Sequence, residues 1–297
     1  MTIRLTRRAF TALAGATLIA PAGAQTSAPP ITRAIPSSGE RLPAVGLGTA
    51  VVFRTADEAT RQKAGAVVQA LLAGGGRLID TASAYGDAEA VVGETVAAAG
   101  LRDKLFIATK LVAPDKAELD RSLARLKTNK IDLLQFHNVR SANQSLAQFK
   151  AWKAQGVCRY IGITSTTEGD YPALEAVLRR EKPDFIQVEY SADEREPEKR
   201  VLAAAAETGA AVLTALPFGR GRLFRAVHGK PLPDWAQPFA ASWGQVFLKF
   251  LLSDPRVTAV IPGTGNPVHM ADNLGAMREP LPDAEQRKRI VALVDSL

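Results

Sequence analysis

The sequence predicts an α/β protein folded as a single (β/α)8 barrel of the TIM type. Eight short apolar runs follow one another along the chain and alternate with longer segments in which Ala, Leu and Val have helical spacing. The segment 42–297 is close to the roughly 250 residues typical of such a barrel. No G-x-G-x-x-G fingerprint follows the first run, which argues against an open dinucleotide-binding sheet.

Residues 1–24 are predicted to be a twin-arginine signal peptide. Arg7 and Arg8 precede a mildly apolar run, and Ala22-Gly23-Ala24 offers the small residues that a signal peptidase needs. The run is too short to span a bilayer, so no stable membrane insertion is expected. This interpretation implies recognition by the twin-arginine translocation machinery and a periplasmic or otherwise exported mature protein. The alternative is a disordered arm that contains a chance arginine pair.

The rest of the chain is interpreted as a leader and one domain. Residues 25–41 are rich in Pro, Ser, Ala and Thr, a leader that can add a short N-terminal hairpin at the base of the barrel of residues 42–297. Strands are expected at 44–49, 77–80, 105–110, 131–137, 159–164, 185–189, 211–215 and 257–262. Helices are expected over 56–73, from Asp87 as a cap, and over 282–297 outside the barrel. The Gly- and Pro-rich link 218–237 is interpreted as a functional loop or lid.

Charge and cysteine content exclude some classes of function. The formal net charge of +7 falls to +4 without the three arginines of the signal peptide. The longest basic block, 287–289, is typical of a solvated helix face, so no nucleic-acid partner is predicted. Cys158 is the single cysteine, which excludes an intramolecular disulfide and suits a buried, inert thiol. The three histidines are far apart in the sequence, and no metal site is predicted.

Three consecutive strands are predicted to end in an ionisable residue. Asp80, Lys110 and His137 close the second, third and fourth strands, and Tyr85 lies in the loop after Asp80. The carboxyl ends of barrel strands meet on one face, where ligands and catalysis gather. One such residue can simply mark the point where the chain reaches solvent, but three in succession indicate a shared site.

These residue types can together protonate a carbonyl oxygen. A phenol has an ordinary pKa of about 10 and is a weak acid at neutral pH. An ammonium beside it favours the phenolate and strengthens the acid, while a carboxylate holds that ammonium charged and in place. An imidazole across the pocket can hydrogen-bond the substrate oxygen. No side chain supplies hydride, so the chemistry requires a cofactor.

Over almost all of its mature length the chain resembles the aldo-keto reductases, (β/α)8 enzymes that reduce aldehydes and ketones with nicotinamide cofactors. The run 80–87 carries the most specific likeness, and Glu89 and Gly93 extend it. The resemblance implies a small-molecule carbonyl substrate and Tyr85 as the general acid. The catalytic tetrad that it implies is Asp80, Tyr85, Lys110 and His137.

The same resemblance implies three groups of cofactor contacts. The nicotinamide end would be held by Gly48, Thr49, Ser165 and Gln187. A loop with glycines that let backbone N–H groups approach phosphate would close over the pyrophosphate, and it comprises Phe218, Gly219, Arg220, Gly221 and Arg222. The adenosine 2′-phosphate would lie at the start of the last barrel helix, near Gly263, Thr264, His269 and Asn273.

The chain departs from the family pattern at three positions. NADP-preferring members commonly place Lys or Arg where this chain has Gly263, and Arg where it has His269, whose charge is less dependable at neutral pH. NADP remains the expected cofactor, with a weak preference for NADPH over NADH. The aromatic residue that often stacks on the nicotinamide is also missing, because Leu216 precedes Pro217.

The leading interpretation is NAD(P)H-dependent reduction of an aldehyde or ketone. An alternative is a non-catalytic, cofactor-binding sensor or partner subunit on the same barrel, against which the presence of all four tetrad residues argues. A metal-dependent barrel hydrolase or isomerase would need more His and acidic ligands at the strand ends. Trp235, Trp243 and Phe224 are candidates for substrate contact, although packing roles suit each of them as well.

Overall fold

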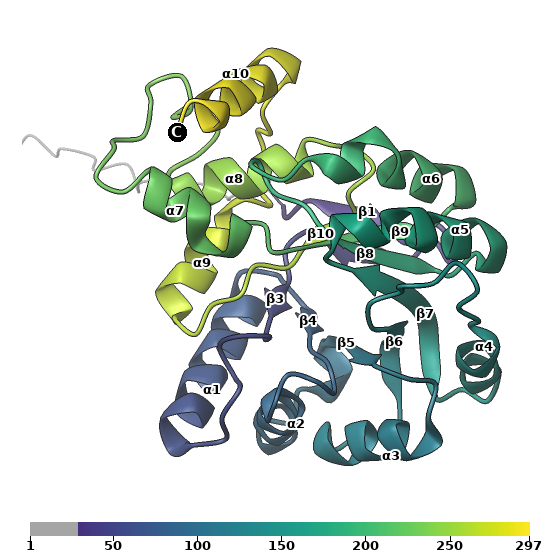
Figure 1. Ribbon diagram of the computed structural model, residues 1–297. Helices are drawn as coiled ribbons and strands as arrows, with labels where there is room; N and C mark the ends of the chain where they lie inside the picture. Colours follow the sequence, from purple (N-terminus) through teal and green to yellow (C-terminus); the bar gives the residue numbers. More distant parts are fainter. Residues whose placement is uncertain (1–28) are drawn as a thin grey trace, which may run out of the picture.

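The computed structural model describes residues 29–297, so the predicted signal peptide lies outside the described residues. Its centre is a sheet of eight parallel strands with helices around it (Figure 1). The strands are β3 (Leu47–Gly48), β4 (Leu78–Asp80), β5 (Phe106–Leu111), β6 (Ile131–Phe136), β7 (Cys158–Ser165), β8 (Phe185–Glu189), β9 (Ala211–Ala215) and β10 (Ala259–Val260). Each strand pairs with the next one along the chain. The predicted (β/α)8 architecture is confirmed.

Backbone contacts between the first and last strands close the barrel. Gly48 forms a parallel bridge with Gly263, and its N–H donates to the carbonyl of Pro262 over 2.9 Å. A Cβ on Gly48 would lie 2.8 Å from the carbonyl oxygen of Ile261. The absence of a side chain therefore allows the two strands to meet.

Helices alternate with the strands and cover the outside of the barrel (Figure 1). They are α1 (Glu58–Ala73), α2 (Ala88–Ala98), η1 (Arg102–Lys104), α3 (Lys116–Arg125), α4 (Ala147–Ala154), η2 (Glu168–Asp170), α5 (Tyr171–Glu181), η3 (Glu196–Lys199), α6 (Val201–Thr208), η4 (Gly219–Gly221), α7 (Arg222–Ala226), α8 (Trp243–Leu252), α9 (Pro267–Gly275) and α10 (Ala284–Asp295). The link 218–237 contains η4 and α7, while α10 lies outside the barrel near α8 (Figure 1). Within residues 29–297, no helix combines the length and hydropathy needed to cross a membrane.

An antiparallel hairpin closes the amino-terminal end of the barrel. It consists of β1 (Thr32–Ala34) and β2 (Arg41–Pro43), and Ile35 and Leu42 pack into the inner core. Between the two strands, the carboxylate of Glu40 accepts a hydrogen bond from Tyr160 over 2.8 Å and pairs with Arg77 over 2.9 Å. The barrel base is therefore sealed by both apolar packing and charge.

Two apolar cores lie on either side of the sheet, because neighbouring side chains on a strand point to opposite faces. On β5, Phe106 and Ala108 pack inside the barrel, whereas Ile107 packs against the helices. Leu133 of β6 and Phe185 of β8 also belong to the inner core. The interior is a packed core and leaves room for a ligand only above it.

Candidate active site

The inward series of side chains continues past the inner core into ionisable residues. Asp80, Lys110 and His137 each lie an even number of positions after an inner-core residue of the same strand. All three side chains therefore stand above the packed interior, at the carboxyl end of the barrel. Tyr85 joins them from the loop after β4, so the structure brings the four predicted residues together.

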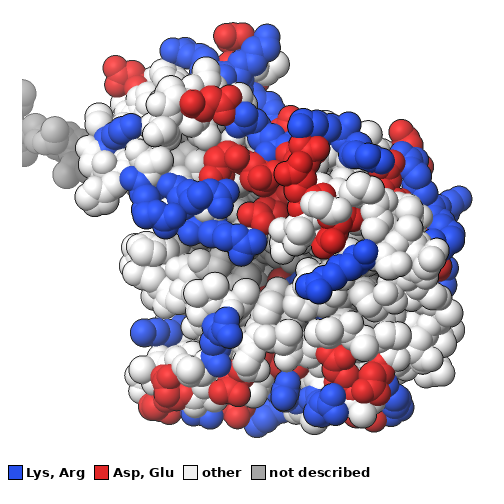
Figure 2. Space-filling model, in the orientation of Figure 1, with Lys and Arg blue, Asp and Glu red and all other residues white. Residues whose placement is uncertain are grey.

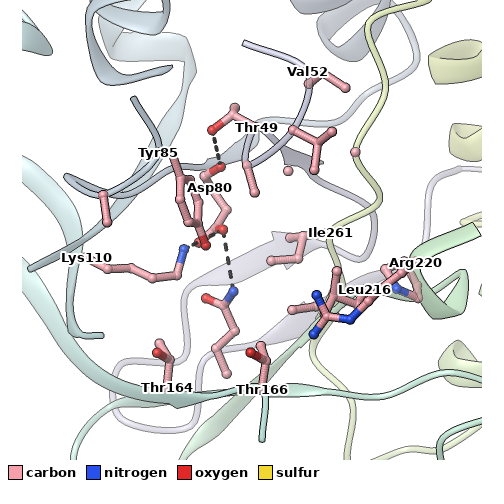
Figure 3. A pocket seen from close by; sticks show the side chains of 18 of the residues that line it. Thr49, Val52, Asp80, Tyr85, Lys110, Thr164, Thr166, Leu216, Arg220 and Ile261 are labelled. Carbon is pink, nitrogen blue, oxygen red and sulfur yellow. Dashed lines mark hydrogen bonds and ion pairs between the residues drawn. The ribbon is translucent and has the colours of Figure 1, made fainter. Parts of the chain in front are cut away.

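Asp80 and Lys110 form a buried ion pair, with 2.6 Å between Oδ2 and Nζ (Figure 3). The Nζ also donates to the carbonyl oxygen of Thr81 over 2.8 Å. Burial lowers the pKa of Lys110, but the charge of Asp80 and the contact with Tyr85 outweigh it and raise that pKa. Burial raises the pKa of Asp80, and the Lys110 ammonium opposes this effect. The raised pKa of Lys110 keeps its ammonium protonated beside Asp80.

Tyr85 stands directly over this pair. The Nζ of Lys110 lies 5.0 Å from the centre of the Tyr85 ring. Two of the three N–H groups of the Lys110 ammonium donate to Asp80 and to the carbonyl of Thr81, which leaves the third for the Tyr85 hydroxyl. Gly86 shapes the turn: its φ is +64°, and a Cβ there would lie 2.7 Å from the carbonyl oxygen of Arg54.

Asp87 occupies the N-cap position of α2, as the sequence predicted, but its side chain does not cap the helix. Its side chain makes no capping hydrogen bond, and its Oδ2 accepts from the backbone N–H of Ala56 over 3.1 Å. The carboxylate therefore ties the loop before α1 to the turn that carries Tyr85. A contact between segments this far apart gives no local signal in the sequence.

His137 completes the group as a neutral imidazole. Its ring lies edge-on to that of Tyr85, with 5.6 Å between the ring centres and 83° between the planes. Burial and the charge of Lys110 lower the pKa of His137 to about 4. Its buried Nδ1 makes no hydrogen bond within residues 29–297. A neutral ring can offer an N–H to a substrate oxygen without adding charge to the site.

Two glutamines support the carboxylate of Asp80 from inside the barrel. Gln135 Nε2 lies 3.4 Å from Oδ1 and Gln187 Nε2 lies 3.5 Å from Oδ2, and Gln135 donates to Gln187 Oε1 over 3.0 Å. Gln187 was expected in the site, but Gln135 was missed by the sequence analysis. Gln135 is a polar residue in an apolar strand and lies two positions before His137, on the same face, which is the pattern that could have identified it.

A cavity of about 680 Å³ opens above these residues (Figure 3). Its walls come from the loops at the carboxyl ends of the strands. Tyr85 and Lys110 lie on one side of it, and Arg220 lies across from them (Figure 3). Of the residues expected to hold a cofactor, those that line it are Gly48, Thr49, Gln187, Phe218, Arg220, Gly221 and Gly263. The others, Ser165, Gly219, Arg222, Thr264, His269 and Asn273, lie outside its lining.

The expectation for Ser165 is corrected by the direction of its side chain. Thr164 and Thr166 line the cavity, whereas Ser165 between them donates to Oδ2 of Asp170 over 3.2 Å. Tyr160 belongs to the inner core, so even-numbered positions of β7 face inward and Ser165 faces outward. Thr164 therefore presents its hydroxyl where the serine was expected.

The arginines of the 218–222 loop are paired with carboxylates. Arg220 lies 3.0 Å from Glu189 Oε2, and Arg222 lies 2.8 Å from Asp193 Oδ2. Acidic and basic side chains lie directly beside one another on the face that Figure 2 shows. Either arginine must therefore exchange a carboxylate for a phosphate if it is to bind one.

The backbone is strained in the 218–222 loop and just before it. Leu216, which lines the cavity, has a φ of +55°, and so does Arg220. Residues other than glycine adopt this region at a cost of about 1–2 kcal/mol, and such strain clusters at functional sites.

The segment after β10 has the helix start that the sequence predicted. Asn266 caps α9 by accepting from the N–H of Val268 over 2.9 Å, and Pro267 follows in the first turn. Thr264 accepts from the N–H of Asn266 over 3.1 Å, and Asn273 is buried. His269 is exposed on α9, beyond the cavity.

The three aromatic candidates for substrate contact lie outside the cavity lining. Trp243 stacks on Phe247, Trp235 lies under the guanidinium of Arg289, and Phe224 packs against Phe218 with 4.7 Å between ring centres. Cys158 is buried, and burial raises the pKa of its thiol to about 12, so this thiol is unreactive. Within residues 29–297, no three His, Cys, Asp or Glu side chains are grouped to hold a metal ion.

Comparisons with known proteins agree with this geometry. The Aldo/keto reductase family matches residues 44–295. An aldo-keto reductase of Mycolicibacterium smegmatis is 30% identical, over 78% of this chain and 81% of its own, and methylglyoxal reductase YeaE of Escherichia coli is 30% identical, over 82% and 88%. An aldo/keto reductase of Klebsiella pneumoniae, solved in complex with NADP and acetate, is 26% identical over 86% of this chain and 92% of its own, with a TM-score of 0.72. The chain belongs to the aldo/keto reductase family.

Proposed function

We propose that this protein reduces an aldehyde or ketone to an alcohol with NADPH, and that Tyr85 is the general acid. The observation that carries the proposal is the position of Tyr85 at a ligand-sized cavity, directly over the buried Lys110–Asp80 pair. Family membership supports the same reaction class.

Each residue of the tetrad has its own role in the proposed reaction. A nicotinamide bound in the cavity would supply the hydride for the carbonyl carbon. Tyr85 donates its hydroxyl proton to the carbonyl oxygen as negative charge develops there, and the Lys110 ammonium stabilises the phenolate that remains. Asp80 holds Lys110 charged and in position. His137 orients the carbonyl oxygen through an N–H.

The cavity fits the nicotinamide and diphosphate parts of such a cofactor. Gln187 and Thr164 offer an amide and a hydroxyl to a carboxamide, and Gly48 lines the same cavity. On the opposite wall Arg220 offers a positive charge to phosphate once it exchanges Glu189 for it, while the N–H of Gly221 is donated to the carbonyl of Phe218. Gly219 lies behind this wall and faces Asp193, where a Cβ would be 2.5 Å from the carboxylate.

The preference for NADPH over NADH is proposed to be weak. The Klebsiella pneumoniae relative was solved with NADP, which supports NADP here. The start of α9 offers His269 in place of an arginine, so its attraction for a 2′-phosphate is modest at neutral pH. Equilibrium titrations of both reduced cofactors are expected to favour NADPH by less than about tenfold. A preference for NADH would contradict this assignment.

The decisive experiment compares the wild type with Tyr85→Phe. The purified protein is examined by absorbance and mass spectrometry for bound nicotinamide, titrated with NADPH, and assayed over a panel of carbonyls. Tyr85→Phe is expected to bind NADPH like the wild type and to lose at least about 100-fold in kcat, because the acid is gone. Equal activity of the two proteins would exclude Tyr85 as the acid. NADPH binding without turnover of any carbonyl by the wild type would favour a sensor.

We also propose that the chain is exported through the twin-arginine route and acts in the periplasm or outside the cell. Support comes from the paired arginines and the Ala22-Gly23-Ala24 site. The test replaces Arg7 and Arg8 by lysines and follows the protein in cell fractions. The variant is expected to stay in the cytoplasm while the wild type is recovered outside it; equal distribution would refute export by this route.

A further inference from the structure

One cation of the cavity lining has no ion-pair partner within the part of the chain that the structure describes. The charged residues of the lining are Arg54, Asp80, Lys110 and Arg220. Asp80 and Lys110 neutralise each other, and Arg220 is paired with Glu189. Arg54 makes no ion pair and no side-chain hydrogen bond within residues 29–297. Arg54, which is exposed at the rim of the cavity, is therefore the charged lining residue that has no ion-pair partner among the described residues.

The backbone of Arg54 is held beside the proposed acid. Its carbonyl oxygen accepts from the N–H of Asp87 over 3.1 Å and lies against Gly86, where a Cβ would approach it to 2.7 Å. The Asp87 carboxylate binds the same loop two residues later, at the N–H of Ala56. The backbone of Arg54 is thus held in place beside the turn that carries Tyr85.

The carboxylates of the neighbouring loops accept hydrogen bonds from backbone N–H groups and form no ion pair with Arg54 among the described residues. Asp87 accepts from Ala56, Asp57 accepts from Thr60 over 2.8 Å, and Glu118 accepts from Val112 over 3.0 Å. None of the three lies within ion-pair distance of Arg54 among the described residues. A guanidinium left unpaired at the rim of a cavity suits a carboxylate or a phosphate, each of which it can bind with two hydrogen bonds.

The position of Arg54 points to the substrate and not to the cofactor. The proposed phosphate contacts are on the wall opposite Tyr85, where Arg220 lies (Figure 3). The backbone of Arg54 belongs to the Tyr85 side, because its carbonyl oxygen lies against Gly86 and Asp87. The apolar residues Val52 and Ala84 also line the cavity. A carbonyl compound that places its oxygen at Tyr85 therefore extends its far end toward Arg54.

We propose that Arg54 selects carbonyl substrates that carry an anionic group, a carboxylate or a phosphate, at the end remote from the carbonyl. The proposal rests on the proposed reductase function. Arg54 donates hydrogen bonds to the anion, the apolar residues contact the intervening carbons, and Tyr85 and His137 receive the carbonyl oxygen.

The test uses matched substrates that differ in charge. The carboxylate arm compares 4-formylbenzoate with 4-formylbenzamide, and the phosphate arm compares glyceraldehyde 3-phosphate with glyceraldehyde. Wild type is expected to favour the charged member of at least one pair by about tenfold or more in kcat/KM, the size of effect that one charge-assisted hydrogen bond gives. The arm with the larger ratio identifies the anion.

Variants at position 54 separate recognition from structure. In Arg54→Gln the ratio is expected to fall to about one, and Arg54→Lys is expected to retain part of it. Arg121→Gln is the matched control, because Arg121 is exposed on α3, has no ion pair among the described residues and does not line the cavity. Its ratio is expected to match that of the wild type.

A binding measurement checks the same point without turnover. Calorimetric titration of 4-(hydroxymethyl)benzoate into NADP⁺-saturated enzyme is expected to show binding about tenfold weaker in Arg54→Gln than in the wild type. A wild-type ratio near one in both arms would overturn the proposal, as would an unchanged ratio in Arg54→Gln. The proposal would also be overturned if Arg54→Gln bound NADPH more weakly and lost kcat/KM equally on charged and neutral substrates. Failure of the wild type to reduce any carbonyl, charged or neutral, would instead count against the reductase function itself.

Discussion

At the scale of single residues, Asp80 is the point where the polar contacts of the cavity converge. Its two carboxylate oxygens meet Lys110, Gln135 and Gln187, and its backbone carbonyl accepts from the Thr49 hydroxyl over 3.0 Å. The residue is 2% exposed, so water cannot replace a lost partner. Removing its charge must therefore affect both folding and the charge of Lys110.

We expect Asp80→Asn to lower the free energy of unfolding by about 3–5 kcal/mol, because it leaves the buried Lys110 ammonium without a counterion. Asp120→Asn breaks an exposed pair with Lys116 and is expected to cost less than about 1 kcal/mol. Urea unfolding at neutral pH measures both. Similar losses in the two variants would show that the buried pair has no special role in stability.

His137 predicts a pH dependence with a definite sign. Its pKa is about 4 in the folded protein against an ordinary value of 6.5, so between these values the unfolded chain binds the proton more readily. This residue therefore stabilises the fold fully above about pH 6.5, and its contribution falls as the pH drops toward 4, by at most about 1.4 kcal/mol per pH unit. Unfolding experiments across this range should give a smaller slope for His137→Asn than for the wild type. Parallel slopes would contradict the shifted pKa.

At the scale of elements, close backbone contact between helices supports the strand that carries Lys110. Gly93 of α2 lies where a Cβ would be 2.1 Å from the carbonyl oxygen of Arg125 at the end of α3. From the same helix, Glu89 reaches the outward side of β5 and accepts from Thr109 over 2.6 Å. Helix α2 therefore holds β5 from outside while Lys110 points inward from the next position.

We expect Gly93→Ala to destabilise the protein by about 1–3 kcal/mol, because the added methyl group has no room between α2 and α3. Gly65→Ala in α1 is the matched control: no atom lies within 4 Å of its added Cβ. Alanine there is expected to stabilise the helix by about 0.5–1 kcal/mol. Thermal unfolding of both variants measures whether the changes in stability have opposite signs. Changes of the same sign would refute the packing argument.

At the scale of the whole molecule, the closed barrel separates stability from chemistry. The hairpin and the inner core occupy the amino-terminal end, and the cavity with its strained loop occupies the carboxyl end. A ligand in the cavity contacts loops after several different strands, so it joins parts of the chain that are far apart in sequence. Binding should therefore stabilise the fold as a unit.

We expect NADPH at about one hundred times its dissociation constant to raise the free energy of unfolding by about 2.7 kcal/mol. Chemical unfolding with and without NADPH measures this difference. Tyr85→Phe is expected to show the same gain, since Tyr85 acts on the substrate. No gain in either protein would contradict a cofactor site in the cavity.

The sequence predicted the order of strands and the tetrad because both depend on local patterns. Asp80, Lys110 and His137 each close an apolar run, which is visible without knowledge of the fold. The role of Ser165 was wrong because it depends on which face of β7 a position occupies, and the strand boundary decides that. The pairing of Arg220 with Glu189 joins residues 31 positions apart and depends on the folded loop. Gln135 was not predicted because a single polar residue within an apolar strand does not by itself indicate a functional site.

The sealed base of the barrel has a consequence for the order of events in turnover. Glu40, Ile35 and Leu42 close one end, so among the described residues the cavity communicates with solvent at the carboxyl face. Two molecules that share one entrance must take turns. With the nicotinamide in its proposed place against Gly48 and Gln187, the cofactor must bind first and leave last, and the carbonyl compound enters and its alcohol leaves in between. Steady-state kinetics should therefore be ordered, with the oxidised nicotinamide competing against the reduced form and the alcohol product leaving before it.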